Sequence, residues 1–117
     1  MPKINLFVYG TLKRGQRNHR LLAGQEFVDS AHTLPGYRLY YSGSYPCLVE
    51  DAINGAAVAG EIWRVDESCL TQLDRLEGAP ALFRRAPIEV EEFTEAVSAY
   101  FYNGDVTGWR DCGTVWP

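Results

Sequence analysis

Short segments with the composition of β-strands follow one another closely in the middle of the chain. The segments FVDSAHTL, YRLYYS, CLVE and AAVAGEIWRV lie between residues 27 and 65. Turn-forming residues separate them, namely Pro35-Gly36, Ser42 to Ser44 and Asn54-Gly55. Several short strands with tight connections are typical of a curled sheet or a small barrel. This spacing therefore predicts a strand-rich fold of that kind.

The flanking sequence adds a strand at the N-terminus and one clear helix. KINLFVY is almost continuously apolar, as expected of a strand covered on both faces, and Gly10 ends it. The helix is DESCLTQLDRLEG, in which Asp66 is a good N-cap and Glu67 suits the positive end of the helix dipole. Gly78 is a good C′ residue for the same helix. We therefore expect an α+β fold, a small mixed β-barrel flanked by short helices.

The other segments complete this picture. RNHRLLAG is expected to supply one or two helical turns before Gly24 ends them. FRRAPIEVEEF and EAVSAYFY are expected to be strands. The tail, NGDVTGWRDCGTVWP, is expected to be irregular, with Trp109 and Trp116 packing over the core.

Length and charge limit the classes of function. A chain of 117 residues with 46% hydrophobic residues is expected to form a single domain, residues 1–117, around a real core. Fifteen acidic and eleven basic residues give a net charge of −4, the wrong sign for a protein that binds nucleic acid. The sequence has no long apolar segment and no secretory features at its start, so we expect no membrane partner and a cytoplasmic location.

The metal-ligating residue types are scattered through the sequence. The three cysteines, Cys47, Cys69 and Cys112, are odd in number and widely spaced, which favours reduced thiols over a disulfide framework or a metal knuckle. His19 and His32 have no neighbouring ligand pattern. We therefore expect neither a metal nor a cofactor.

One acidic residue interrupts the apolar face of the helix. Cys69, Leu70, Leu73 and Leu76 share one side at about 100° per residue, and Glu77 falls on the same side. A carboxylate there is aimed toward the core, in the last helical turn, where burial and the helix dipole both oppose ionisation. A raised pKa suits a general acid/base that works near neutral pH. The alternative is that the helix end frays and Glu77 points into water.

The loop after the first strand, GTLKRGQR, imitates the glycine spacing of a phosphate-binding loop. Gln16-Arg17 stands where such a loop requires Lys-Ser/Thr, which argues against nucleotide binding. The dinucleotide fingerprint G-x-G-x-x-G is absent as well. What remains is a strand-ending glycine followed by backbone N–H groups, which suit a carboxylate or a developing oxyanion. A plain hairpin or strand-to-helix connection is the alternative.

Four stretches together resemble a known family, the γ-glutamyl cyclotransferase-like proteins, and especially the γ-glutamylamine cyclotransferase group. They are FVYGTLKRGQRNHRLL, YPCL, GEIWRVDESCLTQLDRLEGAPALFRR and YFY, in that order along the chain. The resemblance implies a small mixed β-barrel with a cavity where the YGTL loop meets a glutamate. It also implies that the loop binds the glutamyl part of the substrate and that the glutamate transfers protons.

Residue by residue, the resemblance assigns the loop to Tyr9, Gly10, Thr11 and Leu12, and the catalytic acid/base to Glu77. Phe83 departs from the pattern, because many relatives have a tyrosine there.

Neighbouring residues of the implied cavity are assigned by their place in the sequence. Tyr45, Tyr100 and Tyr102 are candidates for its wall, with ordinary core packing as the alternative, and Tyr102 is preferred to Tyr100 for its place at the end of the last expected strand. Lys13 and Arg14 are expected to be solvated charges at its rim, and Arg84 and Arg85 are expected to be solvated rather than to face it.

The implied reaction is cyclisation of a γ-glutamyl amide to 5-oxoproline with release of an amine, without a cofactor. The expected partner is therefore a small γ-glutamyl molecule, and we expect a monomer or homodimer. Two alternatives stay open: a non-catalytic small-molecule binding module of the same fold, and removal of γ-glutamyl groups from a different peptide or biosynthetic intermediate.

Overall fold

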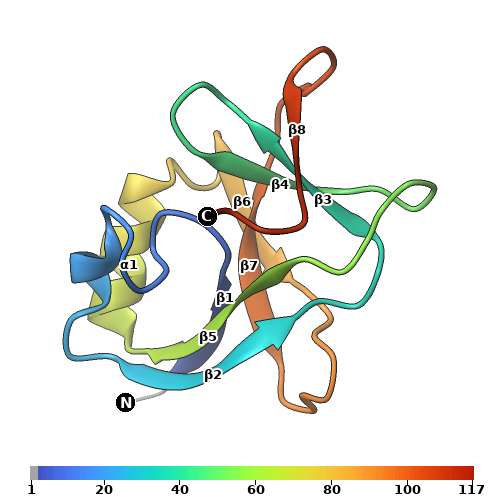
Figure 1. Ribbon diagram of the computed structural model, residues 1–117. Helices are drawn as coiled ribbons and strands as arrows, with labels where there is room; N and C mark the ends of the chain where they lie inside the picture. The colour runs from blue at the N-terminus through green and yellow to red at the C-terminus, as the bar shows by residue number, and fades with distance from the viewer. Residues whose placement is uncertain (1–2) are drawn as a thin grey trace.

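The computed structural model describes residues 3–117, which contain eight β-strands, one α-helix and one short 3₁₀ helix (Figure 1). In chain order these are β1 (Ile4–Val8), η1 (His19–Leu22), β2 (Glu26–His32), β3 (Tyr37–Tyr41), β4 (Pro46–Glu50), β5 (Ala59–Val65), α1 (Glu67–Leu76), β6 (Phe83–Pro87), β7 (Val97–Tyr102) and β8 (Arg110–Gly113).

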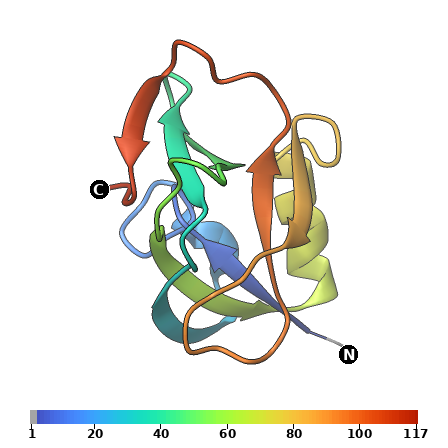
Figure 2. The same ribbon diagram turned by 90° about the vertical axis from the view of Figure 1, so that its right-hand side faces the viewer.

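The strands form two sheets. A five-stranded sheet has the order β2-β5-β1-β7-β6, in which only the β1–β7 pair is parallel. A three-stranded antiparallel sheet has the order β4-β3-β8. Figure 2 shows the segment after β7 crossing from the larger sheet to β8 in the smaller one. The strand-rich fold with one α-helix agrees with the expectation, but no ladder of hydrogen bonds joins the two sheets among residues 3–117, so closure into a barrel is not seen there.

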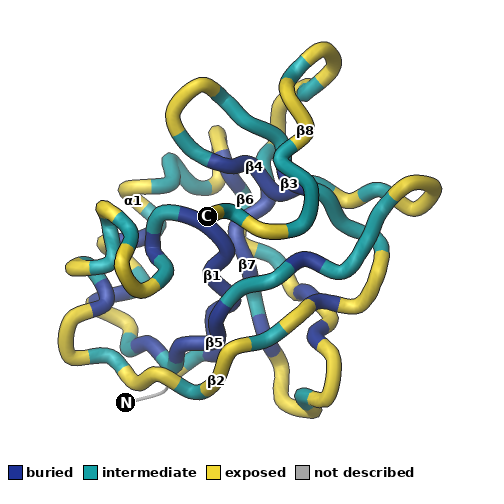
Figure 3. Tube along the Cα trace, in the orientation of Figure 1, coloured by how far each residue is buried: buried dark blue, intermediate teal, exposed yellow. Residues whose placement is uncertain are grey.

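The central strand β1 is covered on both faces, as its continuous apolar sequence predicts. Leu6 and Val8 face a cluster shared with η1 and α1, whereas Phe7 and Tyr9 face a cluster shared with the three-stranded sheet. All four side chains are at most 7% exposed. Alternate residues of a strand point to opposite faces, so a strand between two layers must be apolar throughout. Figure 3 shows this buried stretch surrounded by exposed outer loops.

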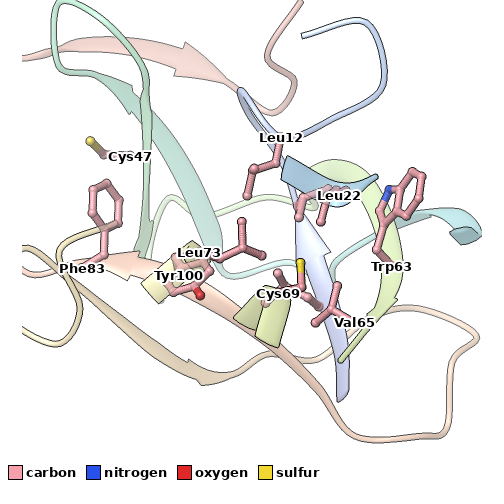
Figure 4. Packing of buried hydrophobic residues seen from close by; sticks show 11 residues of the cluster. Leu12, Leu22, Cys47, Trp63, Val65, Cys69, Leu73, Phe83 and Tyr100 are labelled. Carbon is pink, nitrogen blue, oxygen red and sulfur yellow. The ribbon is translucent and has the colours of Figure 1, made fainter. Parts of the chain in front are cut away.

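The helices pack on one face of the five-stranded sheet (Figures 1 and 4). Asp66 caps α1 as predicted, because its side chain accepts a hydrogen bond from the Cys69 N–H (2.8 Å). Gly78 follows the helix with φ +63°, which is the left-handed conformation expected of a C′ glycine. Cys69 and Leu73 are buried against the sheet, whereas Leu76, which was expected on the packed face, is 44% exposed.

Two boundary predictions are wrong. β6 ends at Pro87 rather than continuing to residue 93, and residues 110–113 of the tail, expected to be irregular, form β8. Pro87 has no N–H of its own to donate, and although the Ile88 N–H still donates to the Val97 carbonyl (3.0 Å), β7 begins at Val97 and, among residues 3–117, β6 pairs with nothing beyond this point. β8 pairs with the edge of β3, a partner about 70 residues away in the sequence, so its local pattern gives little sign of the strand.

Candidate active site

A cavity of about 220 Å³ opens where the end of β1, the start of β4, the end of α1 and the start of β6 converge. Of the predicted site residues, Glu77, Tyr45 and the whole Tyr9 to Leu12 loop line it. Tyr102 does not line it. The cavity is lined by Phe7, Val8, Tyr9, Gly10, Thr11, Leu12, Arg17, Asn18, Tyr45, Pro46, Leu76, Glu77, Leu82, Phe83 and Tyr100.

The loop after β1 turns its carbonyl groups toward the protein. The Gly10 carbonyl accepts from the Lys13 N–H (3.1 Å), and the Thr11 carbonyl accepts from the Asn18 N–H (2.9 Å). The Leu12 carbonyl accepts from His19 Nδ1 (2.9 Å). The amide N–H groups of Gly10, Thr11 and Leu12, in contrast, donate to no residue in the range 3–117. Three successive unused donors at a cavity wall are a suitable site for a carboxylate or an oxyanion.

Gly10 sits close to the first residue of β4. A Cβ atom at this position would lie 2.6 Å from Pro46 Cγ and 3.2 Å from Pro46 Cδ. Real Cβ atoms do not approach carbon atoms so closely, so the backbone reaches this position only without a side chain. The close approach brings the loop against β4 at the cavity wall.

Glu61 of β5 anchors the far end of the loop. Its carboxylate accepts from the Arg14 backbone N–H, from Arg14 Nε and from Trp63 Nε1, each at 3.1 Å. Burial opposes ionisation of Glu61, but these hydrogen bonds outweigh it and lower the pKa. Sequence reasoning missed Glu61, whose only signal was an acidic residue within a largely apolar strand.

The prediction that Lys13 and Arg14 are solvated rim charges is confirmed only in part, because the Arg14 side chain is 51% exposed but both side chains have partners in other segments. Arg14 pairs with Glu61 and lies over the ring of Phe27, 4.0 Å from its centre. Lys13 Nζ donates to the carbonyl of Trp116, and burial lowers the Lys13 pKa. Both side chains therefore fix the loop to other segments.

Glu77 is the residue immediately after α1, it is partly buried, and it lines the same cavity as the loop. Its own N–H donates to the carbonyl of Leu73 (2.9 Å), so helical geometry fixes its position. Its carboxyl group forms no hydrogen bond with residues 3–117. Because every fully buried side-chain oxygen in that range has a partner, the Glu77 oxygens must reach the cavity surface. Burial raises the pKa of Glu77 from 4.5 to about 7.

This raised pKa makes a measurable prediction about stability. Between pH 4.5 and 7 the folded protein keeps a proton on Glu77 that the unfolded chain has lost, so stability falls as the pH rises. The full loss is about 3 kcal/mol, at 1.36 kcal/mol per pKa unit. We expect Glu77→Gln to gain about that much stability over the wild type between pH 4 and pH 8. Urea unfolding of both proteins at each pH measures this, and a pH-independent difference would contradict it.

A hydrogen-bonded network lies next to Glu77 on the helix side. Tyr100 Oη donates to Asp74 Oδ1 (2.6 Å), and Arg85 Nε and Nη2 donate to the two oxygens of the same carboxylate (3.0 and 3.2 Å). Burial opposes ionisation of Asp74, but these hydrogen bonds lower its pKa. Tyr9 Oη donates to the Tyr100 carbonyl (2.7 Å). The network therefore ties the last turns of α1 to β6, β7 and the end of β1.

Neither arginine of β6 lines the cavity. Arg84 pairs with Glu50 (3.0 Å) and lies over the ring of Phe101, and Arg85 pairs with Asp74. The prediction that they avoid the cavity agrees with these positions, although both have charged partners.

Aromatic rings form the wall between the cavity and the outer surface. Tyr45 and Phe83 line the cavity with ring centres 6.0 Å apart. Tyr102 lies behind them, with its ring centre 5.4 Å from Phe83 and 5.2 Å from Trp109. The structure therefore places Tyr102 in packing contact with the wall. Trp109 and Trp116 pack as expected, Trp116 by stacking on Tyr41.

Two further properties concern the described residues 3–117. No three histidine, cysteine or acidic side chains gather there in the arrangement of a metal site. No helix in that range has both the length and the apolar character needed to cross a bilayer.

The sequence and the fold were compared with known proteins. The model of the family described as "Gamma-glutamyl cyclotransferase, AIG2-like" matches residues 6–114. A Vibrio cholerae protein named "Putative gamma-glutamylcyclotransferase" is 42% identical over 95 residues, which are 81% of this chain and 80% of that protein. The rat gamma-glutamylaminecyclotransferase is 39% identical over 93 residues, which are 74% of this chain but 62% of the rat protein, less than two thirds of its length.

The same relationship is seen in three dimensions. The crystal structure of an AIG2-like protein from Mus musculus matches with a TM-score of 0.83 and 29% identity, over 93% of this chain and 83% of the mouse chain. The family match spans nearly all the described strands and both sides of the cavity. This chain therefore belongs to the AIG2-like family of gamma-glutamyl cyclotransferases.

Proposed function

We propose that this protein is a γ-glutamylamine cyclotransferase-like enzyme, which converts a γ-glutamyl amide into 5-oxoproline and a free amine. The observation that carries the proposal is the position of Glu77, a carboxyl group with a pKa of about 7 that lines the same cavity as three residues with unused backbone N–H groups. A group with a pKa near the working pH serves equally well as base and acid.

Glu77 performs both proton transfers in this proposal. In its ionised form it takes a proton from the α-ammonium group of the substrate, and the freed amine attacks the γ-carbonyl carbon to form the ring C–N bond. The ring nitrogen of the tetrahedral intermediate loses its second proton to solvent, the oxyanion re-forms the carbonyl, and the original amide C–N bond breaks. Protonated Glu77 gives its proton to the departing amine, which returns the carboxylate to its starting state.

The loop is proposed to stabilise a negative charge on the substrate during these steps. The N–H groups of Gly10, Thr11 and Leu12 are proposed to bind either the α-carboxylate of the glutamyl part or the oxyanion that develops at the γ-carbonyl. Loss of one such donor typically lowers a rate by about 10²-fold.

The reaction is intramolecular, so the protein mainly has to hold the substrate in a folded conformation. Well-oriented intramolecular reactions reach effective molarities of about 10⁵ M or more. A small cavity with one acid/base and one anion site is sufficient for this task. Glu77 and the loop residues Gly10 to Leu12, which are proposed to supply them, line the cavity.

The direct test is product identification. We expect incubation of the purified protein with γ-glutamyl-ε-lysine, γ-glutamyl amino acids and glutathione to release 5-oxoproline from at least one of the first two classes, detected by chromatography and mass spectrometry. Binding by calorimetry without any 5-oxoproline would instead favour a binding module of the same fold. Turnover of glutathione alone would favour removal of γ-glutamyl groups from a different peptide.

A further inference from the structure

The cavity wall carries one charge that the proposed reaction does not use. Of its lining residues, all within the described part of the chain, Arg17 and Glu77 are the ones with charged side chains. Glu77 is taken up by the proton transfers, whereas Arg17 has no assigned role. Among the described lining residues, Arg17 is the one with a cationic side chain. A positive charge at a cavity proposed to bind amides of glutamate calls for a functional explanation.

Arg17 is held in place by the protein without being neutralised by it. Its Nη2 donates to the carbonyl of Ser44 in the β3–β4 connection (2.7 Å), and its own carbonyl accepts from Arg20 Nη1 (2.7 Å). A guanidinium group has five N–H donors, so most of them stay available.

Among residues 3–117, four of the nine arginines have no carboxylate partner, and of these four only Arg17 lines the cavity. The other five arginines pair with a carboxylate at 3.5 Å or less, namely Arg14, Arg38, Arg64, Arg84 and Arg85. Arg17 has no carboxylate partner among residues 3–117. A guanidinium fixed at a cavity and left unpaired is arranged to bind an anion from outside the chain.

The depth of Arg17 in the cavity, relative to the loop and Glu77, determines which end of the substrate it contacts. Tyr9, which precedes the unused N–H groups, and Leu12, which carries one of them, are 7% and 5% exposed, and Glu77 is partly buried. Arg17 is exposed and fixed to a surface connection, so it lies at the mouth. The reacting glutamyl part therefore occupies the inner end, and the leaving amine extends toward Arg17.

We propose that Arg17 selects γ-glutamyl amides whose leaving amine carries its own carboxylate. This inference rests on the proposed function and names the substrate class for the same cavity. The guanidinium pairs with the carboxylate of the leaving amine, and the hydrogen bond to Ser44 reduces the conformational entropy lost on binding. Because Arg17 is exposed, solvent weakens the pair, and we expect a preference of about tenfold in kcat/KM.

The test compares substrates that differ only in charge. γ-Glutamyl-β-alanine is paired with γ-glutamyl-β-alaninamide, and γ-glutamyl-4-aminobutyrate with its amide. The two members of each pair have nearly the same size, and the two pairs differ in the distance between the γ-amide and the terminal carboxylate. At low ionic strength we expect the wild type to favour each acid over its amide by about tenfold. Arg17→Gln is expected to lose this preference while keeping the wild-type kcat/KM for the amides, and Arg17→Lys is expected to keep part of it.

Arg75→Gln is the matched control, because it removes the same charge from an exposed position of α1 that does not line the cavity. It should keep the preference for acids. Equal losses on acids and amides in Arg17→Gln, or no preference in the wild type, would overturn the assignment of Arg17 while leaving the cyclotransferase proposal intact. Failure of the wild type to form 5-oxoproline from any of these substrates would overturn both.

Discussion

Replacement of Glu77 by glutamine is expected to lower kcat by about 10³-fold, within the range that general acid/base catalysis contributes. Glutamine keeps the size of the side chain and its hydrogen-bonding atoms, but it cannot accept the proton of the α-ammonium group. Substrate binding should be nearly unchanged, because the anion site of the loop lies on another segment. Single-turnover formation of 5-oxoproline measures the chemical step, and calorimetry measures binding.

The control for this variant is Glu67→Gln, an exposed position in the first turn of the same helix. It makes the same chemical change on α1 at the end away from the cavity, and it should keep wild-type turnover. Near-wild-type turnover in Glu77→Gln would rule out this residue as the acid/base. If Glu77→Gln binds substrate fully but does not turn it over, and is more stable than the wild type at pH 8, the group that titrates and transfers the proton is the Glu77 carboxyl group at the cavity.

Replacement of Gly10 by alanine is expected to lower kcat/KM by about 10²-fold, since a displacement of about 1 Å in a site can have an effect of this size. The added Cβ would lie 2.6 Å from Pro46 Cγ, so the loop must move away from β4. That movement shifts the N–H groups of Gly10, Thr11 and Leu12 relative to Glu77. Steady-state kinetics on the preferred substrate and urea unfolding separate lost activity from lost stability.

A double-mutant cycle identifies the cause. Pro46→Ala removes the ring atoms Cγ and Cδ, which lie within 3.2 Å of the new Cβ, and leaves Pro46 Cβ, at 4.0 Å, in ordinary contact. The Gly10→Ala, Pro46→Ala double variant should therefore recover much of the activity that Gly10→Ala loses. Strictly additive losses would show that the two positions do not act through this contact.

The helix α1 and the strand β1 were largely predictable, because the residues that indicate each of them lie within a few positions of one another in the sequence. Asp66 and Gly78 delimit α1 through hydrogen bonds and backbone angles that involve only their neighbours. The uninterrupted apolar run of β1 indicated two covered faces, and the structure has both. Leu76 was misplaced because the packing of the final helical turn depends on what covers it, and here it borders the cavity.

The pairing of distant segments was not predictable from the same patterns. β8 exists because β3 offers it an edge, and the local patterns that suggested a small barrel gave no sign that the strands divide into two sheets. Lys13 and Arg14 were expected to be solvated, and Arg14 is exposed, but their partners Trp116 and Glu61, about 100 and 47 residues away, were not foreseen. Partners so far apart in the chain leave no trace in local periodicity.

The sequence by itself determined the family, the β-rich architecture, and the pairing of a glycine loop with a glutamate at the end of a helix. All three features depend on the types of residues in short motifs and on the order of those motifs along the chain. The tertiary structure alone decided that Glu77 has no hydrogen-bond partner among residues 3–117, that Tyr102 lies behind the cavity wall, and that Arg17 lies at its mouth. Burial and charge at one point are set by several segments at once, and only the folded chain brings those segments together.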